Sequence, residues 1–244
     1  MIEELLPESV VAVEAFGDER SQNATLYPEE ERIVARAVDK RRREFTAVRV
    51  CARLAMEKLG VPAQAVPTGE RGAPAWPLGL SGSMTHCEGY RAAALVRAGD
   101  LASLGIDAEV HAPLPDQVFE SIALPAEQRR HRALSASRPG VHWDRLLFSA
   151  KESVYKAWFP LAHAWLDFSE ADIELVTHAG SGTHIGSGTH AGSGSHAGAV
   201  TRGGFRARLL VPGPLVGGVR LTAFDGRWLV ADGLVLTAVT VPHR

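Results

Sequence analysis

The last third of the chain alternates short apolar segments with turn residues, and this pattern restricts the fold more than any other. The segments that read as strands are 171–177, 205–211, 219–224, 227–232 and 234–239. Asp225-Gly226 and Asp232-Gly233 have the composition of hairpin turns between such segments. A strong amphipathic helix pattern at about 143–158, stopped by Pro160, comes directly before them. We therefore expect a meander of strands preceded by a long helix.

The first half repeats the order of helices before strands. A helical region runs from Pro28 to about Leu59 and is broken once. Its core-facing stripe consists of Phe45, Val48, Ala52, Ala55 and Leu59. Residues 90–98 and 101–110 are predicted to form a hairpin with a tight turn at Gly99-Asp100, which would bring 86–90 near 107–110. Together with a short strand at 10–16 and a helical patch at 115–134, this predicts an α+β fold.

Composition narrows the class of protein. With 244 residues, 45% of them hydrophobic, the chain can bury a substantial core in one large domain or two small ones. Its net charge of -2 gives no reason to expect nucleic acid or a membrane as a partner. Cys51 and Cys87 lack the spacing of a disulfide framework or a zinc site, and no apolar run approaches a membrane span. We expect a cytoplasmic protein.

One segment differs from the rest in composition. Residues 178–198 form a hexapeptide repeat rich in Gly, Ser and Thr, with His178, His184, His190 and His196 at a fixed spacing. Such a sequence has little to bury, which predicts a flexible excursion between two strands. A linker grown by duplication is favoured over a metal-binding role for these histidines.

The first candidate site is the pair Asp107 and Glu109 in the sequence GIDAEV. Residues two apart on a strand point to the same face, so both carboxylates would project together. Adjacent carboxylates repel each other, and Mg²⁺, a hard cation that takes oxygen ligands, suits such a pair. The same spacing also occurs on the solvated face of a half-buried strand, and the pattern alone leaves both readings open.

The second candidate is FSAKESVYKAW, which contains Lys151, Glu152 and Lys156. Glu152 and Lys156 are four apart and lie on one side of a helix, with Lys151 beside them. They would form either an ordinary surface ion pair or a set for phosphoryl transfer, in which the acid binds metal or takes a proton and the lysines stabilise phosphate and leaving group.

The third candidate is basic. Arg41 continues the core stripe of the helical region, and Arg49 lies about 40° from that line. Both suit a phosphate ligand, because arginine matches phosphate oxygens in a bidentate way, although a solvated basic face is the more common outcome. His86, just before a predicted strand, could also reach a phosphate or serve as a structural turn residue.

Taken together and in order, these segments resemble the 4′-phosphopantetheinyl transferase family, and within it the monomeric, actinobacterial type that activates siderophore and polyketide synthases. The resemblance covers nearly the whole chain and rests on these segments: REFTAVRVCARLAMEKLGVP, GERGAPAWP, GSMTHCEGY, GIDAEV and HWDRLLFSAKESVYKAWFP. The most specific feature is G-I-D-x-E followed some forty residues later by F-S-x-K-E-x-x-Y-K.

This resemblance implies two similar α/β halves with a pseudo-two-fold arrangement, residues 1–100 and 101–244, and coenzyme A in the cleft between them. The metal ligands would be Asp107, Glu109 and Glu152, binding Mg²⁺ with Mn²⁺ as a substitute. The coenzyme A ligands would be Arg41, Arg49, Arg71, Gly72, Pro74, Thr85, His86, Lys151 and Lys156. The loop 71–74 would lie along the adenine, although Ala73 replaces a residue that is charged in many relatives.

The implied reaction is attack by the serine hydroxyl of an apo acyl or peptidyl carrier protein on the phosphate that bears pantetheine, with release of 3′,5′-ADP. Glu152 and Lys156 would be the catalytic residues. Two alternatives use the same residues: a metal-dependent phosphohydrolase acting on a nucleotide or coenzyme A, and a non-catalytic coenzyme A or carrier-protein binding module. The intact D-x-E and K-E pattern argues against the binding module.

Overall fold

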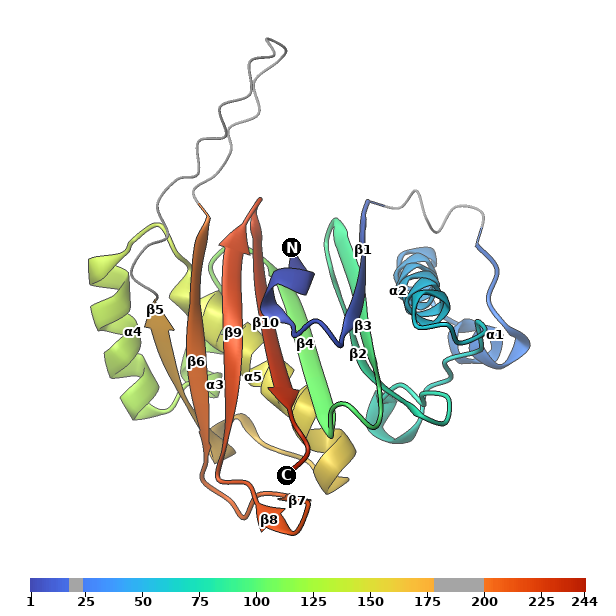
Figure 1. Ribbon diagram of the computed structural model, residues 1–244. Helices are drawn as coiled ribbons and strands as arrows, with labels where there is room; N and C mark the ends of the chain where they lie inside the picture. Colours follow the sequence, from blue (N-terminus) through green and yellow to red (C-terminus); the bar gives the residue numbers. More distant parts are fainter. Residues whose placement is uncertain (18–23, 178–199) are drawn as a thin grey trace, which may run out of the picture.

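The chain folds into two helix-on-sheet halves. The computed structural model describes residues 1–17, 24–177 and 200–244. The predicted flexible repeat at 178–198 lies outside these residues. Within them, no helix has the length and apolar character that crossing a membrane requires. The predicted α+β class is confirmed: each half is an antiparallel sheet with a long helix on one face (Figure 1).

The N-terminal half contains the smaller sheet. Its strands are β1 (Val11–Phe16), β2 (Leu80–Cys87) and β3 (Tyr90–Arg97), in the order β1-β3-β2. The predicted helical region is broken once, into α1 (Pro28–Val34) and α2 (Asp39–Lys58). Helix α2 packs on the sheet through Ala52 and Ala55, as the apolar stripe predicts, and also through Met56, which the stripe does not include. A one-turn 3-10 helix, η3 (Glu70–Gly72), lies in the loop before β2.

The C-terminal half contains a five-stranded sheet with β4 and β5 at its two edges. The order is β4-β10-β9-β6-β5, and every neighbouring pair is antiparallel. The strands are β4 (Ser103–Val110), β5 (Ala171–Thr177), β6 (Thr201–Leu209), β9 (Ala223–Ala231) and β10 (Leu234–Val241). The shorter elements of this half are α3 (Val118–Ile122), α4 (Pro125–Ser137), η4 (Phe168–Glu170), β7 (Leu215–Val216) and β8 (Val219–Arg220).

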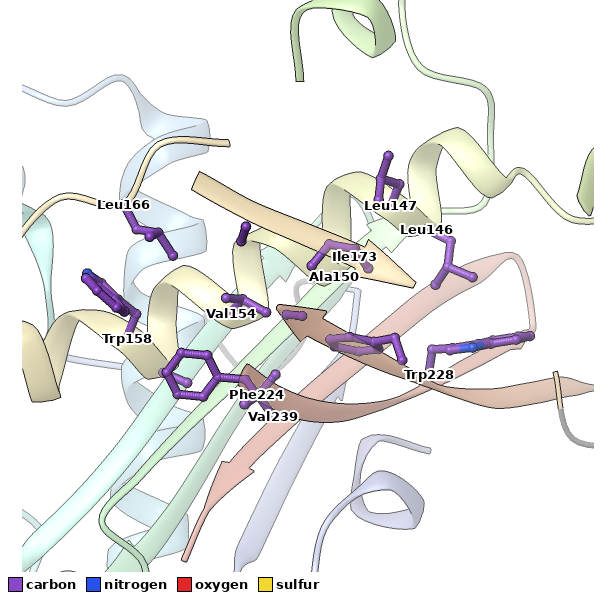
Figure 2. Packing of buried hydrophobic residues seen from close by; sticks show 14 of the residues in the cluster. Leu146, Leu147, Ala150, Val154, Trp158, Leu166, Ile173, Phe224, Trp228 and Val239 are labelled. Atoms are coloured by element: carbon purple, nitrogen blue, oxygen red, sulfur yellow. The ribbon is translucent and has the colours of Figure 1, made fainter. Parts of the chain in front are cut away.

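Helix α5 (Trp143–Ala162) lies across this sheet and forms its main core. Its buried face meets strand residues such as Ile173, Phe224 and Trp228 (Figure 2). The helix continues past Pro160, where the sequence predicts its end, and stops at His163 with a left-handed backbone (φ 49°). Only Leu161 and Ala162 follow Pro160 in the helix, so the hydrogen bond that the proline cannot donate affects just the last turn of α5.

The two halves meet along β2 and β4. The backbone N–H groups of Ile106 and Ala108 on the edge strand β4 donate to the hydroxyls of Ser83 (3.0 Å) and Thr85 (3.0 Å) on β2. A second apolar cluster, which includes Leu104, Ile106 and residues of the N-terminal 3-10 helix η1 (Ile2–Leu5), fills the space between the sheets. Side-chain hydroxyls thus satisfy edge groups that would otherwise be buried without partners.

Two hairpin predictions are wrong. Residues 90–98 and 101–110 do not form a hairpin, because β3 pairs with β1 and β2 while β4 pairs with β10 in the other sheet. The predicted closeness of 86–90 to 107–110 nevertheless arises, through β2 rather than β3. Asp225-Gly226 lies inside β9, where a side chain at Gly226 would overlap the ring of Phe205. Asp232-Gly233 does form the predicted turn, with positive φ at both residues.

Candidate active site

A cavity of about 670 Å³ lies between the N-terminal half and helix α5. Side chains of α1, α2, the η3 loop and β2 line one part of it, and one face of α5 lines the rest. Of the predicted site residues, the cavity brings together Arg41, Arg49, Arg71, Gly72, Pro74, His86, Glu152 and Lys156. It therefore joins residues that are more than a hundred positions apart in the sequence.

Lys156 and Asp107 form the contact between α5 and β4. Lys156 Nζ lies 2.7 Å from Asp107 Oδ1 and also donates to the carbonyl oxygen of Ile106 at 3.1 Å. The hydroxyl of Thr85 donates to the same Asp107 oxygen at 3.3 Å. Thr85 is thus placed beneath Asp107 on the β2–β4 junction and does not line the cavity. Asp107 Oδ2 is buried and has no hydrogen-bond partner among the described residues.

Glu152 lines the cavity one turn before Lys156. Its pKa is raised, above all by burial and also by the negative charge of Asp107, while Lys156 favours the ionised form. The helical spacing predicts that Lys156 lowers the pKa of Glu152. It does not show the burial of Glu152, which has the larger effect and raises that pKa. A half-buried carboxylate with a raised pKa is a stronger base than an exposed one, which suits proton transfer.

Glu109 is held by an arginine that the sequence reasoning does not single out. Arg145 Nη1 lies 3.0 Å from Glu109 Oε2, and its other guanidinium nitrogens donate to the carbonyl oxygens of Ala112 and Pro113. Burial and the neighbouring Asp107 charge raise the pKa of Glu109 to about 7. Arg145 precedes Glu152 by two helical turns and so lies near its face of α5, a signal that could have identified it.

The carboxylates fit a divalent cation by their chemistry. In the described part of the chain, no three His, Cys, Asp or Glu side chains are arranged to hold a metal ion by themselves. However, Mg²⁺ in phosphoryl-transfer sites is bound by only one or two carboxylates together with substrate phosphates and water. Asp107 Oδ2 is buried without a partner among the described residues, and the pKa of Glu109 is raised mainly by burial and then by the charge of Asp107. A divalent cation would give that oxygen a partner and favour the ionised form of Glu109.

Arg41 and His86 meet at the cavity although they are 45 residues apart. Arg41 Nη1 is 2.9 Å from His86 Nε2, and Glu44 approaches the other ring nitrogen at 3.9 Å. Burial, followed by the nearby cations, lowers the pKa of His86, with Glu44 acting in the opposite direction. An exposed guanidinium beside a neutral imidazole is an arrangement that accepts a phosphate group readily.

Arg49 lies deeper and already has partners. Its guanidinium stacks 3.2 Å from the ring centroid of Phe45, donates to the carbonyl oxygen of Val66 at 3.1 Å and lies 4.0 Å from Glu30. Burial lowers its pKa to about 10. Arg49 therefore joins α2 to the segment at 66–68 and also contributes to the cavity wall. Tyr155, to which no sequence pattern assigns a role, lines the cavity from α5 next to Lys156.

Lys151 does not reach the cavity, which corrects the sequence expectation of a phosphate contact. Its side chain is 2% exposed, and Nζ lies 3.0 Å from Glu127 Oε1. One residue along a helix turns the side chain by about 100°, so the neighbour of a cavity-facing glutamate can point into the core. Glu127, on α4, was not predicted as its partner because only the fold brings the two together.

Comparison with known proteins agrees with this geometry. Residues 29–96 match the 4′-phosphopantetheinyl transferase N-terminal domain family, and residues 103–201 match the 4′-phosphopantetheinyl transferase superfamily. The chain is 51% identical over 242 residues to the 4′-phosphopantetheinyl transferase Svp of Streptomyces mobaraensis, covering 99% of this chain and 89% of that protein.

Two further relatives also match this chain over almost its whole length. The 4′-phosphopantetheinyl transferase Npt of Nocardia iowensis is 47% identical over 240 residues, which is 98% of this chain and 99% of that protein. The 4′-phosphopantetheinyl transferase PptT of Mycobacterium tuberculosis is 41% identical over 244 residues, covering 99% and 98% respectively. The similarity therefore includes both halves and the cavity between them.

Proposed function

The chain belongs to the 4′-phosphopantetheinyl transferase superfamily, and we propose that coenzyme A occupies the cavity between α5 and the N-terminal half. Enzymes of this superfamily transfer the phosphopantetheine arm of coenzyme A to a carrier protein. The observation that carries the proposal is that Glu152 and Lys156 share one cavity wall with Arg41 and His86 across from them. The cations that would bind phosphate and the base that would accept a hydroxyl proton thus line the same cavity.

Within this space, Arg41, Arg49 and His86 bind the 3′-phosphate region, and the loop Arg71-Gly72-Ala73-Pro74 lies along the adenine. Support comes from the cavity lining, which contains all of these residues. Arg71 is exposed and its one ion-pair contact among the described residues is a long one, 4.0 Å to Glu70, so its side chain can follow a ligand at the rim. The N-terminal half, residues 1–100, then supplies most contacts to the nucleotide, and residues 101–244 supply the reacting groups.

The carboxylates Asp107, Glu109 and Glu152 would hold Mg²⁺, or Mn²⁺ in its place. When bound, the ion offsets the charge of the pyrophosphate and polarises the phosphate under attack. Asp107 offers its unpartnered oxygen directly. Glu109 would join by exchanging or sharing its contact with Arg145, whose second and third hydrogen bonds keep the guanidinium in place.

The chain's own residues account for the remaining steps. Glu152 accepts the proton of the carrier serine hydroxyl as its oxygen attacks the phosphate that bears pantetheine. Lys156, fixed by Ile106 and Asp107, stabilises the charge that develops on the phosphate oxygens and on the departing 3′,5′-ADP. We also propose that the enzyme acts as a cytoplasmic monomer, since both halves of one chain contribute residues to the cavity lining.

Intact-mass analysis of an apo acyl or peptidyl carrier protein tests the proposal. The carrier is incubated with coenzyme A, Mg²⁺ and the enzyme, and the nucleotide products are identified in the same sample. We expect the carrier to gain one phosphopantetheine arm, with one 3′,5′-ADP released for each arm. Hydrolysis of coenzyme A with no change in the carrier mass would contradict transfer and identify a phosphohydrolase.

A further inference from the structure

Lys151 uses all of its hydrogen-bonding capacity inside the protein. An ammonium group has three donors. In Lys151 they are directed at Glu127 Oε1 (3.0 Å) and at the carbonyl oxygens of Phe168 (2.6 Å) and Ala171 (2.9 Å). Burial lowers the pKa of Lys151, and the charge of Glu127 opposes that effect. No donor of this lysine is left for a phosphate.

Glu127 is occupied in the same way. Its Oε1 accepts from the backbone N–H of Ile173 at 2.7 Å, and its Oε2 accepts from that of Leu124 at 2.7 Å. The side chain is 1% exposed. The Lys151–Glu127 pair therefore joins α5 to the first turn of α4, to η4 and to the start of β5. Glu127 and backbone groups are the main compensation for the Lys151 charge, with a smaller contribution from Asp172, so removing one member of the pair leaves the other buried.

Lys156 makes the opposite attachment. It holds α5 to β4, whereas Lys151 holds it to β5, and β4 and β5 are the two edges of the five-stranded sheet. Five residues along a helix correspond to a rotation of about 140° between the two side chains. A helix tied at two edges and at two angles can neither slide across the sheet nor turn about its axis. Glu152 lies between the two attachments.

We propose that Lys151 is a positioning residue for the transfer reaction. It acts through Glu127 to fix the rotation of α5, so that Glu152 and Lys156 stay at the cavity and against Asp107, and it makes no contact with coenzyme A. The inference rests on the proposed function only for the role of Glu152. The attachment of α5 by Lys151 is given by the contacts of that residue and does not depend on the proposed function.

Steady-state transfer and calorimetric coenzyme A binding on five proteins test this role. The proteins are the parent, Lys151→Met, Glu127→Gln and the double variant, with Arg206→Met as a control that removes an exposed ion pair with Asp225 on the same sheet. We expect kcat to fall by about tenfold to a hundredfold in Lys151→Met and Glu127→Gln, because a misplacement of 1 Å costs on the order of 10²-fold. The Kd for coenzyme A should stay within about twofold of the parent.

The double variant removes both charges of the pair and leaves neither buried alone, so it carries the test if a single variant does not fold. Its kcat should also fall, by less than the product of the two single losses, because both substitutions remove one attachment. Hydrogen exchange in α5 should quicken in all three variants and not in the control, and this readout does not require transfer. If the parent enzyme shows no transfer, the proposed function is refuted, whereas the attachment of α5 is still tested by hydrogen exchange.

Two results would overturn the positioning role. The first is a coenzyme A Kd raised tenfold or more in Lys151→Met or the double variant while Glu127→Gln resembles the parent, since that is the behaviour of a phosphate ligand. The second is parental kcat in Glu127→Gln or in the double variant.

Discussion

Lys156 Nζ lies 2.7 Å from Asp107 Oδ1, which joins the long helix of the C-terminal half to the edge strand that borders the N-terminal half. The contact places a cation next to a carboxylate whose second oxygen is buried and has no partner among the described residues. An arrangement of this kind gains little as a structural ion pair, because Asp107 loses its water on burial while Lys156 stays partly exposed. In the proposed mechanism the unpartnered oxygen would bind the metal and Lys156 a phosphate.

We expect Asp107→Asn to reduce transfer by at least about a hundredfold, because the residue loses the charge that orients Lys156 and binds metal. The amide has the same shape, so the hydrogen bond from Thr85 and the fold should survive. Transfer rates at several Mg²⁺ concentrations and a thermal unfolding curve check this. Asp225→Asn, an exposed aspartate of the same half, is the matched control. Near-parental turnover in folded Asp107→Asn would remove Asp107 from the site.

The close approach of β4 to α5 gives a second prediction. A side chain at Gly105 would overlap the carbonyl oxygen of Ser153 and lie 2.7 Å from the backbone nitrogen of Ala157. Gly105→Ala should therefore push α5 away from β4 and destabilise the protein by about 1–3 kcal/mol, as overpacking of a core does. Denaturant unfolding and transfer rates should both decline. Gly99→Ala, which meets no atom within 4 Å, should leave both unchanged. Equal stability of the two variants would contradict the packing described here.

His86 provides a prediction about protons. Burial and neighbouring cations hold its pKa below 6.5 in the free enzyme, so the imidazole is mostly neutral at pH 6.5. A bound phosphate favours the protonated form and raises that pKa. Coenzyme A binding at pH 6.5 should therefore take up protons, which calorimetry detects as a dependence of the binding heat on the buffer. The uptake should disappear in His86→Gln. An unchanged uptake in this variant would place the proton elsewhere.

Much of the fold could be predicted from periodicity. The apolar stripe of α2, the strands of the C-terminal half and the break between α1 and α2 all follow local patterns. The pairing of β4 could not be predicted, because a Gly-Asp sequence between two strands is typical of a hairpin, and only the long-range partner β10 takes β4 into the other sheet. Gly226 has the composition of a turn but lies within β9, where it accommodates Phe205.

The positions of site residues were predictable where two residues lie on the same helix or strand and their spacing determines which face they share. Glu152 and Lys156 share a helix face, and both lie at the cavity. Spacing along the chain does not show which partners come from distant segments. Glu127 takes Lys151 away from the cavity, Arg145 takes up Glu109, and Glu30 and Val66 draw Arg49 into the wall. A sequence shows which residues are charged, but the fold determines which charges already have partners.

The most direct test of the account compares coenzyme A binding with single-turnover transfer in Glu152→Gln. The substitution removes a base and a metal ligand but keeps the shape of the side chain. A general base contributes about 10² to 10⁴ in rate, so we expect transfer to fall at least that far. Coenzyme A affinity, measured by calorimetry on the same preparation, should remain close to that of the parent. Transfer within about threefold of the parent would show that the Glu152 carboxylate is a surface charge and that the reaction takes place without it.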